Sequence, residues 1–126
     1  MITFPDSILG DLGILPLERS ETIPSSWYTD PGMSEIEKKC LFASSWQYVG
    51  HTSGVQNPGD YFCAVVADNP IIVVLGKDDI LRGFYNVCRH RGGPLAISGQ
   101  GNCHALQCKY HGWTYALDGM LRGIPQ

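Results

Sequence analysis

The sequence predicts an all-β domain of antiparallel strands with one short helix near its N-terminus. Its 126 residues include 15 glycines and 8 prolines, so turns must be frequent. From residue 46 onward, short stretches rich in Val, Ile, Tyr and Phe alternate with turn signals, which is typical of strands joined by tight turns. A content of 44% hydrophobic and 17% charged residues is that of a globular chain, and the length fits one domain with a modest core.

The N-terminal part is predicted to be less regular. Residues 1–33 contain Pro5, Pro16, Pro24 and Pro31, which interrupt any long element. We therefore divide the chain into an irregular lead-in, residues 1–33, and one domain, residues 34–126, which includes the helix.

The single helix is expected to begin at Ser34. Ser34 and Glu37 have the spacing of a capping box, in which each side chain binds the backbone N–H of the other residue. The helix should reach about Ser45 and have Ile36, Cys40 and Ala43 on one face, with Cys40 buried.

The rest of the chain is expected to form strands. They are predicted over residues 46–49, 60–66, 71–75, 80–87, 102–108, 113–117 and 120–122. Turn signals separate several of them, at residues 57–60, 67–70, 77–79 and 118–119. Four hydrophobic residues of these strands are expected in the core: Trp46, Cys63, Phe84 and Tyr85.

Charge and hydropathy exclude several classes of function. The net charge of -3 gives no reason to expect a nucleic-acid partner. The longest apolar run, Ile71–Leu75, is too short to span a membrane, and Asp6 and Asp11 interrupt the N-terminus where a secretory signal would be apolar. We expect no membrane association and a cytoplasmic location, where cysteines stay reduced.

Four residues that can bind metal occur in two short motifs. Cys88 and His90 are separated by one residue, Cys108 and His111 by two, and 17 residues lie between His90 and Cys108. Glycines follow both motifs, and glycine lets the backbone approach a metal cluster closely.

The mixture of residue types predicts a [2Fe–2S] cluster on Cys88, His90, Cys108 and His111. Two thiolates would hold one iron and two neutral imidazoles the other, which removes negative charge and makes the cluster easier to reduce. Structural zinc is the alternative, but zinc fingers usually pair two Cys and then two His, with the His on a helix. We expect one-electron transfer and assign no catalytic residue.

The stretches around these motifs also have a recognisable sequence pattern. The relevant stretches are Ser26–Pro31, Trp46–His51, Cys88–Pro94, Cys108–Gly119 and Gly123–Pro125. Together they resemble the Rieske domain of ring-hydroxylating oxygenase α subunits, over about residues 25–126. The resemblance implies a Rieske-type antiparallel β sandwich with a small cluster-binding subdomain, and a proline loop at Gly123–Pro125 that covers the cluster.

Three positions separate this chain from respiratory and photosynthetic Rieske proteins. Gly93 and Tyr110 stand where those proteins have two disulfide-forming cysteines, and Trp113 stands where they have a serine that donates to a cluster sulfur. Because fewer donors stabilise the reduced cluster less, the resemblance implies the lower-potential, oxygenase type.

A second iron site is not expected in this chain. Members of the family oxidise substrates at a mononuclear iron held by two His and one carboxylate. Only His51 and His104 remain beside the two cluster histidines, and they form no paired motif. We therefore expect Fe(II) only in a catalytic domain that this chain lacks, and expect the chain alone to hydroxylate nothing.

The resemblance also implies partners. A ferredoxin or flavin reductase would donate electrons, the oxygenase catalytic domain would accept them, and the intact enzyme would be a homo-oligomer. A stand-alone Rieske ferredoxin-type carrier is the alternative function. Arg89, Arg91 and Lys109 lie beside the ligands, and we expect them either to steer an acidic donor or only to keep the loops hydrated.

Overall fold

The computed structural model describes residues 15–96 and 99–125 and divides into two compact units, Met1–Trp46 and Gln47–Gln126. The first unit contains only helices in its described part. They are η1 (Leu17–Arg19), η2 (Ser25–Tyr28), α2 (Pro31–Ile36) and the π-helical η3 (Glu37–Phe42). Of the irregular lead-in predicted for residues 1–33, residues 1–14 lie outside the described part of the chain.

The predicted start of the helix at Ser34 is wrong. The helix begins at Pro31, and Asp30 is its N-cap, because the Asp30 carboxylate accepts a hydrogen bond from the Gly32 N–H at 2.7 Å. Pro31 suits the first helical position because its fixed φ is already helical. Cys40 is half-buried rather than buried.

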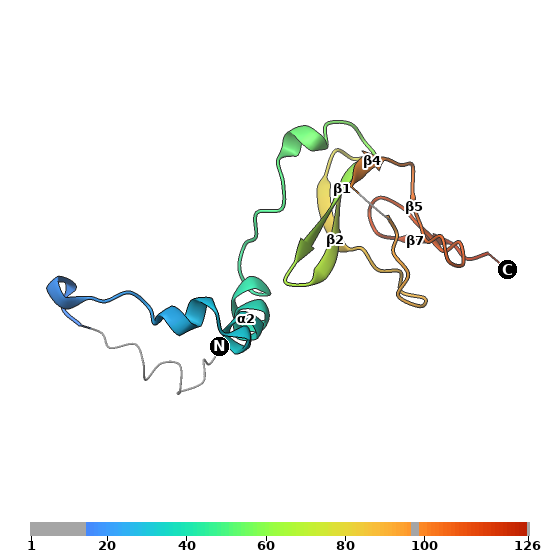
Figure 1. Cartoon of the computed structure of the whole chain (residues 1–126). Coiled ribbons are helices and arrows are strands. Elements are labelled where there is room, and N and C mark those ends of the chain that lie inside the picture. The colour runs from blue at the N-terminus through green and yellow to red at the C-terminus, as the bar shows by residue number, and fades with distance from the viewer. Residues whose placement is uncertain (1–14, 97–98, 126) are drawn as a thin grey trace. The chain divides into compact units, whose positions relative to one another are not determined.

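The second unit consists of two antiparallel sheets (Figure 1). The larger has the order β3-β2-β1-β4 and the smaller β5-β6-β7, and the short helix η4 (Thr52–Gly54) precedes them. The strands are β1 (Asp60–Val66), β2 (Asn69–Leu75), β3 (Leu81–Tyr85), β4 (Gln100–Asn102), β5 (Leu106–Gln107), β6 (Thr114–Tyr115) and β7 (Leu121–Gly123). This arrangement confirms the predicted antiparallel β fold with one short α-helix.

The hairpin between β1 and β2 shows how local sequence sets the register. Val66 pairs with Asn69, so only Ala67 and Asp68 form the turn, with φ of 47° and 65°. Two central residues with positive φ define a type I′ turn, whose twist matches that of paired strands. The resulting register places Ile72 and Val74 in the core.

Several predicted strand boundaries need correction. Residues 46–49 form no strand. The predicted strand 102–108 is two strands, because the chain leaves β1 after Asn102 and pairs with β6 from Leu106. Only residues 114–115 of the predicted strand 113–117 are paired.

Two aromatic residues predicted in the core are exposed. Trp46 is fully exposed. Tyr85 lies on β3, an edge strand, where side-chain alternation points Leu81, Gly83 and Tyr85 outward while Phe84 is half-buried. Cys63 is also half-buried and packs against the core.

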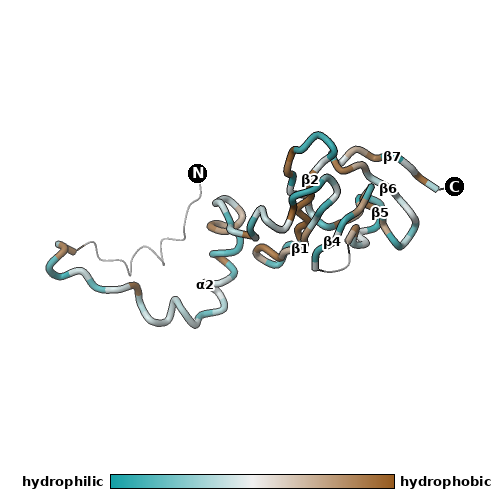
Figure 2. Tube along the Cα trace, turned by 90° about the horizontal axis from the view of Figure 1, so that it is seen from above, coloured by the Kyte–Doolittle hydropathy of each residue, from teal (hydrophilic) through white to brown (hydrophobic). Residues whose placement is uncertain are grey.

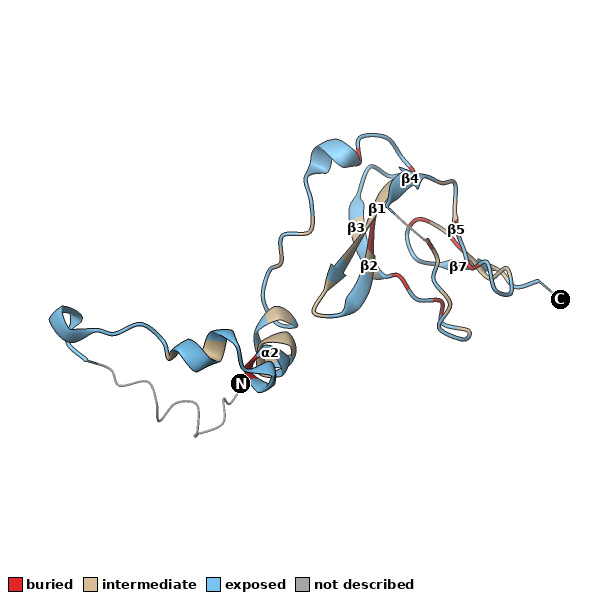
Figure 3. Cartoon of the chain, viewed as in Figure 1, coloured by how far each residue is buried: buried red, intermediate tan, exposed pale blue. Residues whose placement is uncertain are grey.

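The core lies between the two sheets of the second unit. Figure 2 shows hydrophobic residues concentrated along β1 and β2, and Figure 3 shows buried residues on β2 and around the second sheet. The buried cluster comprises Ile72, Val74, Cys88, Ala96, Leu106, Cys108, Tyr115 and Leu117. Both cysteines of the predicted metal site therefore belong to the core of the fold.

Candidate metal centre

The first motif forms a tight turn over residues 88–93, called here the first loop. The N–H of Cys88 donates to the carbonyl oxygen of Gly93 at 2.7 Å, and the N–H of Gly92 donates to the carbonyl oxygen of Cys88 at 2.9 Å. Gly92 has a φ of 73°, which glycine adopts without strain. The chain thus turns back directly after the thiol, with His90 in the turn.

The second motif, residues 108–113 or the second loop, repeats this geometry. The N–H of Cys108 donates to the carbonyl oxygen of Trp113 at 2.8 Å, and the N–H of Gly112 donates to that of Cys108 at 2.9 Å. Gly112 has a φ of 75°. The two loops have equal length and equivalent hydrogen bonds, although their histidines occupy different positions, third in the first loop and fourth in the second.

These loops bring the four predicted ligands together in two pairs. Cys88 and Cys108 are both buried in the same hydrophobic cluster, and the Cys108 thiol helps to lower the pKa of Cys88. The imidazole rings of His90 and His111 lie edge to face with their centroids 4.8 Å apart. His90 is half-buried and His111 is exposed. The site thus has an interior thiol side and an imidazole side that reaches solvent.

Asn86, which the sequence analysis missed, fixes the base of the first loop. It is buried, and its side-chain oxygen accepts from the N–H groups of Leu95 and Ala96, both at 2.9 Å. Its amide nitrogen donates to the carbonyl oxygen of Ala96 at 2.6 Å. These bonds tie the end of β3 to the segment that follows the loop, and so hold the position from which Cys88 projects.

Tyr115 on β6 is the second residue that the sequence analysis missed. Its buried hydroxyl lies 3.4 Å from the Cys88 sulfur and accepts a hydrogen bond from the Arg89 N–H at 3.2 Å. With its oxygen occupied as an acceptor, the hydroxyl proton can be donated to the sulfur. The signal was present in the sequence, since β6 directly follows the second loop and alternation turns Tyr115 inward.

The surroundings of Cys88 favour its thiolate. Burial alone raises the pKa of Cys88, but hydrogen bonds to the sulfur outweigh burial and bring that pKa below its ordinary value. In order of size, these bonds come from the Tyr115 hydroxyl, the His90 N–H, the Cys108 thiol and the Arg91 N–H. The thiolate is the form that binds iron.

The surroundings of His90 favour its neutral form. Partial desolvation lowers the pKa of His90, and the positive charges of His111 and Arg91 lower it further. A neutral imidazole has a free nitrogen lone pair for a metal ion. Trp113 stacks on the His90 ring, with centroids 4.8 Å apart and planes within 5°. A residue of the second loop therefore holds a predicted ligand of the first.

Gly93 and Tyr110 lie next to each other, as their assignment to the disulfide positions of respiratory and photosynthetic Rieske proteins requires. A Cβ atom placed on Gly93 would lie 3.6 Å from the Tyr110 Cβ and 3.2 Å from the Cys108 sulfur. The first distance is within the range of disulfide-linked Cβ atoms. The second shows that glycine leaves room for the Cys108 sulfur.

The C-terminal proline also lies against the site. A Cβ atom on Gly112 would come within 2.8 Å of the Pro125 ring. The segment Gly123–Pro125 therefore reaches the second loop, as the predicted proline loop requires.

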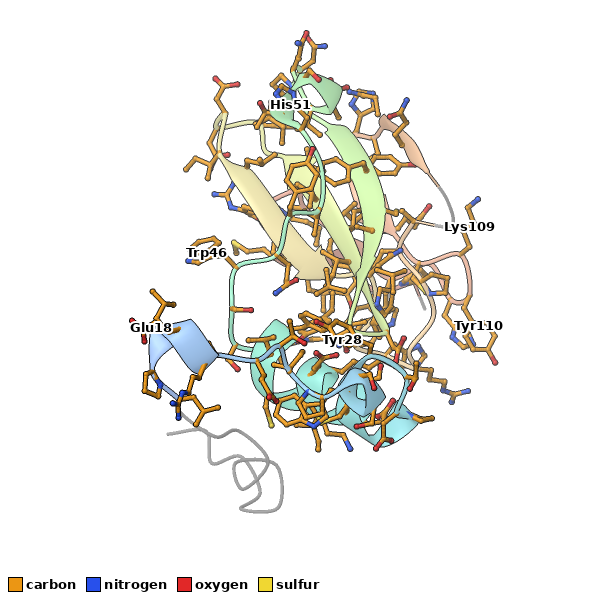
Figure 4. All side chains as sticks on the ribbon, turned by 60° about the vertical axis from the view of Figure 1, so that its left-hand side comes forward. Glu18, Tyr28, Trp46, His51, Lys109 and Tyr110 are labelled. Atoms are coloured by element: carbon orange, nitrogen blue, oxygen red, sulfur yellow. The ribbon has the colours of Figure 1, made fainter. Side chains whose placement is uncertain are left out.

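The loops carry positive charge on their outer side. Arg89, Arg91 and Lys109 are all exposed. Lys109 and Tyr110 project from the second loop (Figure 4). No Asp or Glu occurs between Arg82 and Asp118 in the sequence, so nothing within these loops neutralises the three bases.

The other two histidines do not join this group. The His51 ring accepts the Ser53 N–H at 3.1 Å at the start of η4, and His104 is exposed beside Lys77 and Asp78. Among the described residues, no three His, Cys, Asp or Glu side chains converge as ligands of a single ion.

The types of ligand at this site fit a two-iron cluster. A mixed-ligand [2Fe–2S] cluster takes two thiolates on one iron and two imidazoles on the other, so its ligands need to form two pairs rather than a single shell. The site offers such pairs: two adjacent buried thiols, one of them with a hydroxyl donor, and two adjacent imidazoles.

A family model described as the Rieske [2Fe-2S] domain matches residues 45–126. The chain belongs to the Rieske [2Fe–2S] domain family. A Rieske cluster is accordingly its cofactor, and the matched range contains both loops.

Known relatives of this Rieske chain are oxygenases. It is 41% identical over 118 residues to the carnitine monooxygenase oxygenase subunit of Escherichia coli strain K12, covering 93% of this chain and 31% of that protein. It therefore spans about a third of this curated relative.

Solved structures agree. Naphthalene 1,2-dioxygenase from Rhodococcus sp., bound to indole, superposes with a TM-score of 0.82 at 31% identity, over 95% of this chain and 26% of that one. A quaternary ammonium Rieske monooxygenase, studied for carnitine oxidation by gut microbiota and inter-subunit electron transfer, gives 0.77 at 42% identity, over 82% and 28%. The Rieske fold is confirmed, and these relatives favour an oxygenase α subunit over a stand-alone carrier.

No helix within the described part of the chain is long and apolar enough to cross a bilayer.

Proposed function

We propose that this chain is the electron relay of a Rieske non-haem iron oxygenase. Cys88 and Cys108 would hold one iron of its cluster, and His90 and His111 the other. The observation that carries this assignment is the pair of matching loops, which present two buried thiols and two adjacent imidazoles.

Each of the chain's residues has a distinct part in this function. When bound, the cluster supplies a site that takes up and releases one electron at a time. Burial of both thiols keeps water from the sulfurs, and the Tyr115 hydroxyl would donate to the negatively charged Cys88 thiolate. Trp113 holds the plane of His90, while His111 leaves an exposed edge toward partners.

The rest of the oxygenase is proposed from the relatives. In this proposal a ferredoxin or flavin reductase delivers electrons in the cytoplasm, and a catalytic domain with mononuclear Fe(II) accepts them within a homo-oligomer. The length of the curated relative and the oxygenase activities of the solved structures support this arrangement.

Two measurements test the relay. Anaerobic reductive titration of the chain with its cluster reconstituted should consume one electron per chain. Incubation with reductant, oxygen and an aromatic or quaternary amine substrate should give no hydroxylated product. Turnover by the purified chain would reveal a second iron site and contradict the assignment.

We further propose that the functional domain is residues 34–126, which includes the last three residues of α2 and all of η3. Two truncated chains, beginning at residue 34 and at residue 47, test this boundary. The longer one should retain its cluster at higher temperature, followed by visible absorbance. Equal retention would move the domain boundary to residue 47.

A further inference from the structure

We propose that a groove beside the first loop is the docking site of an acidic electron-donor protein. The groove, called here the uptake groove, lies between the end of β3 and the small sheet and has a volume of about 360 Å³. The proposal rests on the relay function above and adds the surface through which the electron arrives.

The lining of the uptake groove is mostly apolar and much of it is exposed. It includes Tyr85, Val87 and Leu121, whose exposed fractions are 65%, 38% and 43%. Phe84 and Leu106 line it as well. Contiguous exposed apolar surface on a small domain is typical of an interaction site.

The walls of the groove reach the cluster ligands directly. Trp113 lines the groove and stacks on His90, and Tyr115 lines it and contacts the Cys88 sulfur. The rate of electron tunnelling falls steeply with distance. A donor seated in the groove would be separated from one ligand on each iron by a single aromatic side chain.

Charge identifies the kind of donor. Among the residues that the structure describes, Arg89 is the only charged one that lines the groove, and the exposed Arg91 and Lys109 belong to the two loops beside it. An acidic protein surface complements this cationic, apolar face, and such complementarity speeds association. The cavity at the opposite end of β3 differs, because both Asp78 and Arg122 line it.

The proposed reaction is the transfer of a single electron from donor to acceptor. The reduced donor is oxidised by one electron, the centre held by this chain is reduced by one, and no bond forms or breaks. The oxidised donor then leaves, so the contact needs to be brief, which suits a small groove rather than a large permanent interface.

The test measures reduction by a protein donor. The chain with its cluster is mixed in a stopped-flow instrument with a reduced, acidic plant-type [2Fe–2S] ferredoxin at several ionic strengths. Leu121→Glu and Tyr85→Glu should slow second-order reduction about tenfold at low salt, because each adds a repelling charge and removes apolar contact. Arg89→Gln should slow it about threefold and flatten the salt dependence.

Ile80→Glu is the matched control. Ile80 is 52% exposed, precedes β3 at the end remote from the loops, and lies outside the groove lining. This substitution changes the net charge equally, so its rate should stay within about twofold of the parent if only the local surface matters. Leu121→Asn serves in addition if Leu121→Glu folds poorly. The reduction potential of each variant is measured as well, so that a change in driving force can be distinguished from a change in docking.

Dithionite separates the two proposals. It is small and needs no docking surface, so it should reduce the parent and all variants to the same final spectrum. A parent without a [2Fe–2S] spectrum under dithionite would refute the relay function. If dithionite reduces the parent but the ferredoxin does not, or if the groove variants react as fast as Ile80→Glu, the docking proposal is overturned.

Discussion

The first and second loops have the same backbone hydrogen bonds but differ in the side chains that surround them. In the first, Tyr115 and Trp113, both from outside the loop, hold Cys88 and His90. In the second, the exposed His111 contacts Tyr110 of its own loop, with ring centroids 3.8 Å apart. The same turn therefore produces one braced histidine and one exposed histidine.

This difference assigns separate roles to the two histidines. A braced ligand keeps its geometry when the charge of the cluster changes, so reorganisation on electron transfer is small. An exposed ligand shortens the distance to a partner. We infer that the first loop mainly sets the properties of the cluster and, through the uptake groove beside it, receives the electron, whereas the exposed His111 of the second loop offers an edge to the electron acceptor.

The largest effect should be the same in both loops. Cys88→Ala and Cys108→Ala each remove a thiolate from the same iron, and we expect each to lose the cluster entirely. Iron and acid-labile sulfide analysis after reconstitution measures this. A variant that keeps a full cluster would show that its cysteine is not a ligand.

Replacing a histidine should affect the two loops differently. His90→Cys or His111→Cys adds a thiolate to the reducible iron and should lower the reduction potential by on the order of 100 mV. His111→Cys should retain more cluster, because His90→Cys also loses the stack with Trp113. Protein-film voltammetry gives the potentials. An unchanged or raised potential in a variant that keeps its cluster contradicts the ligand assignment.

A smaller effect should distinguish two tyrosines. Tyr115→Phe removes the donor to the Cys88 sulfur, and if that bond strengthens by about 1 kcal/mol on reduction, the potential should fall by roughly 40 mV. Tyr110→Phe is the matched control and should leave the potential nearly unchanged, since within the described part of the chain the Tyr110 hydroxyl bonds to neither the Cys88 nor the Cys108 sulfur. Equal shifts in the two variants would remove the special role given to Tyr115.

The smallest effects concern the equivalent glycines. Gly92→Ala should destabilise the first loop by about 1–2 kcal/mol, because φ at this position is in the left-handed region. Gly112→Ala has the same backbone penalty and also meets Pro125, so it should destabilise by about 1 kcal/mol more. Thermal unfolding of the reconstituted variants gives the comparison. Equal losses would mean that Pro125 does not press on the second loop.

The sequence predicted the fold best where local signals and pairing agreed. Residues 60–66 are rich in strand-forming residues and form β1 as predicted, whereas residues 46–49 also contain strand-forming residues but find no partner strand. Tyr85 was placed in the core because strand composition does not reveal that β3 is an edge strand. The helix start was misplaced because two capping signals compete, and Asp30 followed by proline prevails over Ser34.

The candidate site, too, was only partly predictable from the sequence. The spacing of Cys and His within the chain was enough to predict the four candidate ligands, because they lie in short motifs. Motif spacing did not reveal their support, because Asn86 and Tyr115 act on residues 10 and 27 positions away, and only the side-chain alternation after the second loop pointed to Tyr115. The stack of Trp113 on His90 likewise depends on how the two loops face each other.

The most direct test of the account is electron paramagnetic resonance of the dithionite-reduced chain, combined with metal and sulfide analysis. Mixed thiolate and imidazole ligation predicts two irons and two acid-labile sulfides per chain and a rhombic low-field signal of a Rieske cluster. One tightly bound zinc per chain without labile sulfide, or the signal of an all-cysteine cluster, would contradict it.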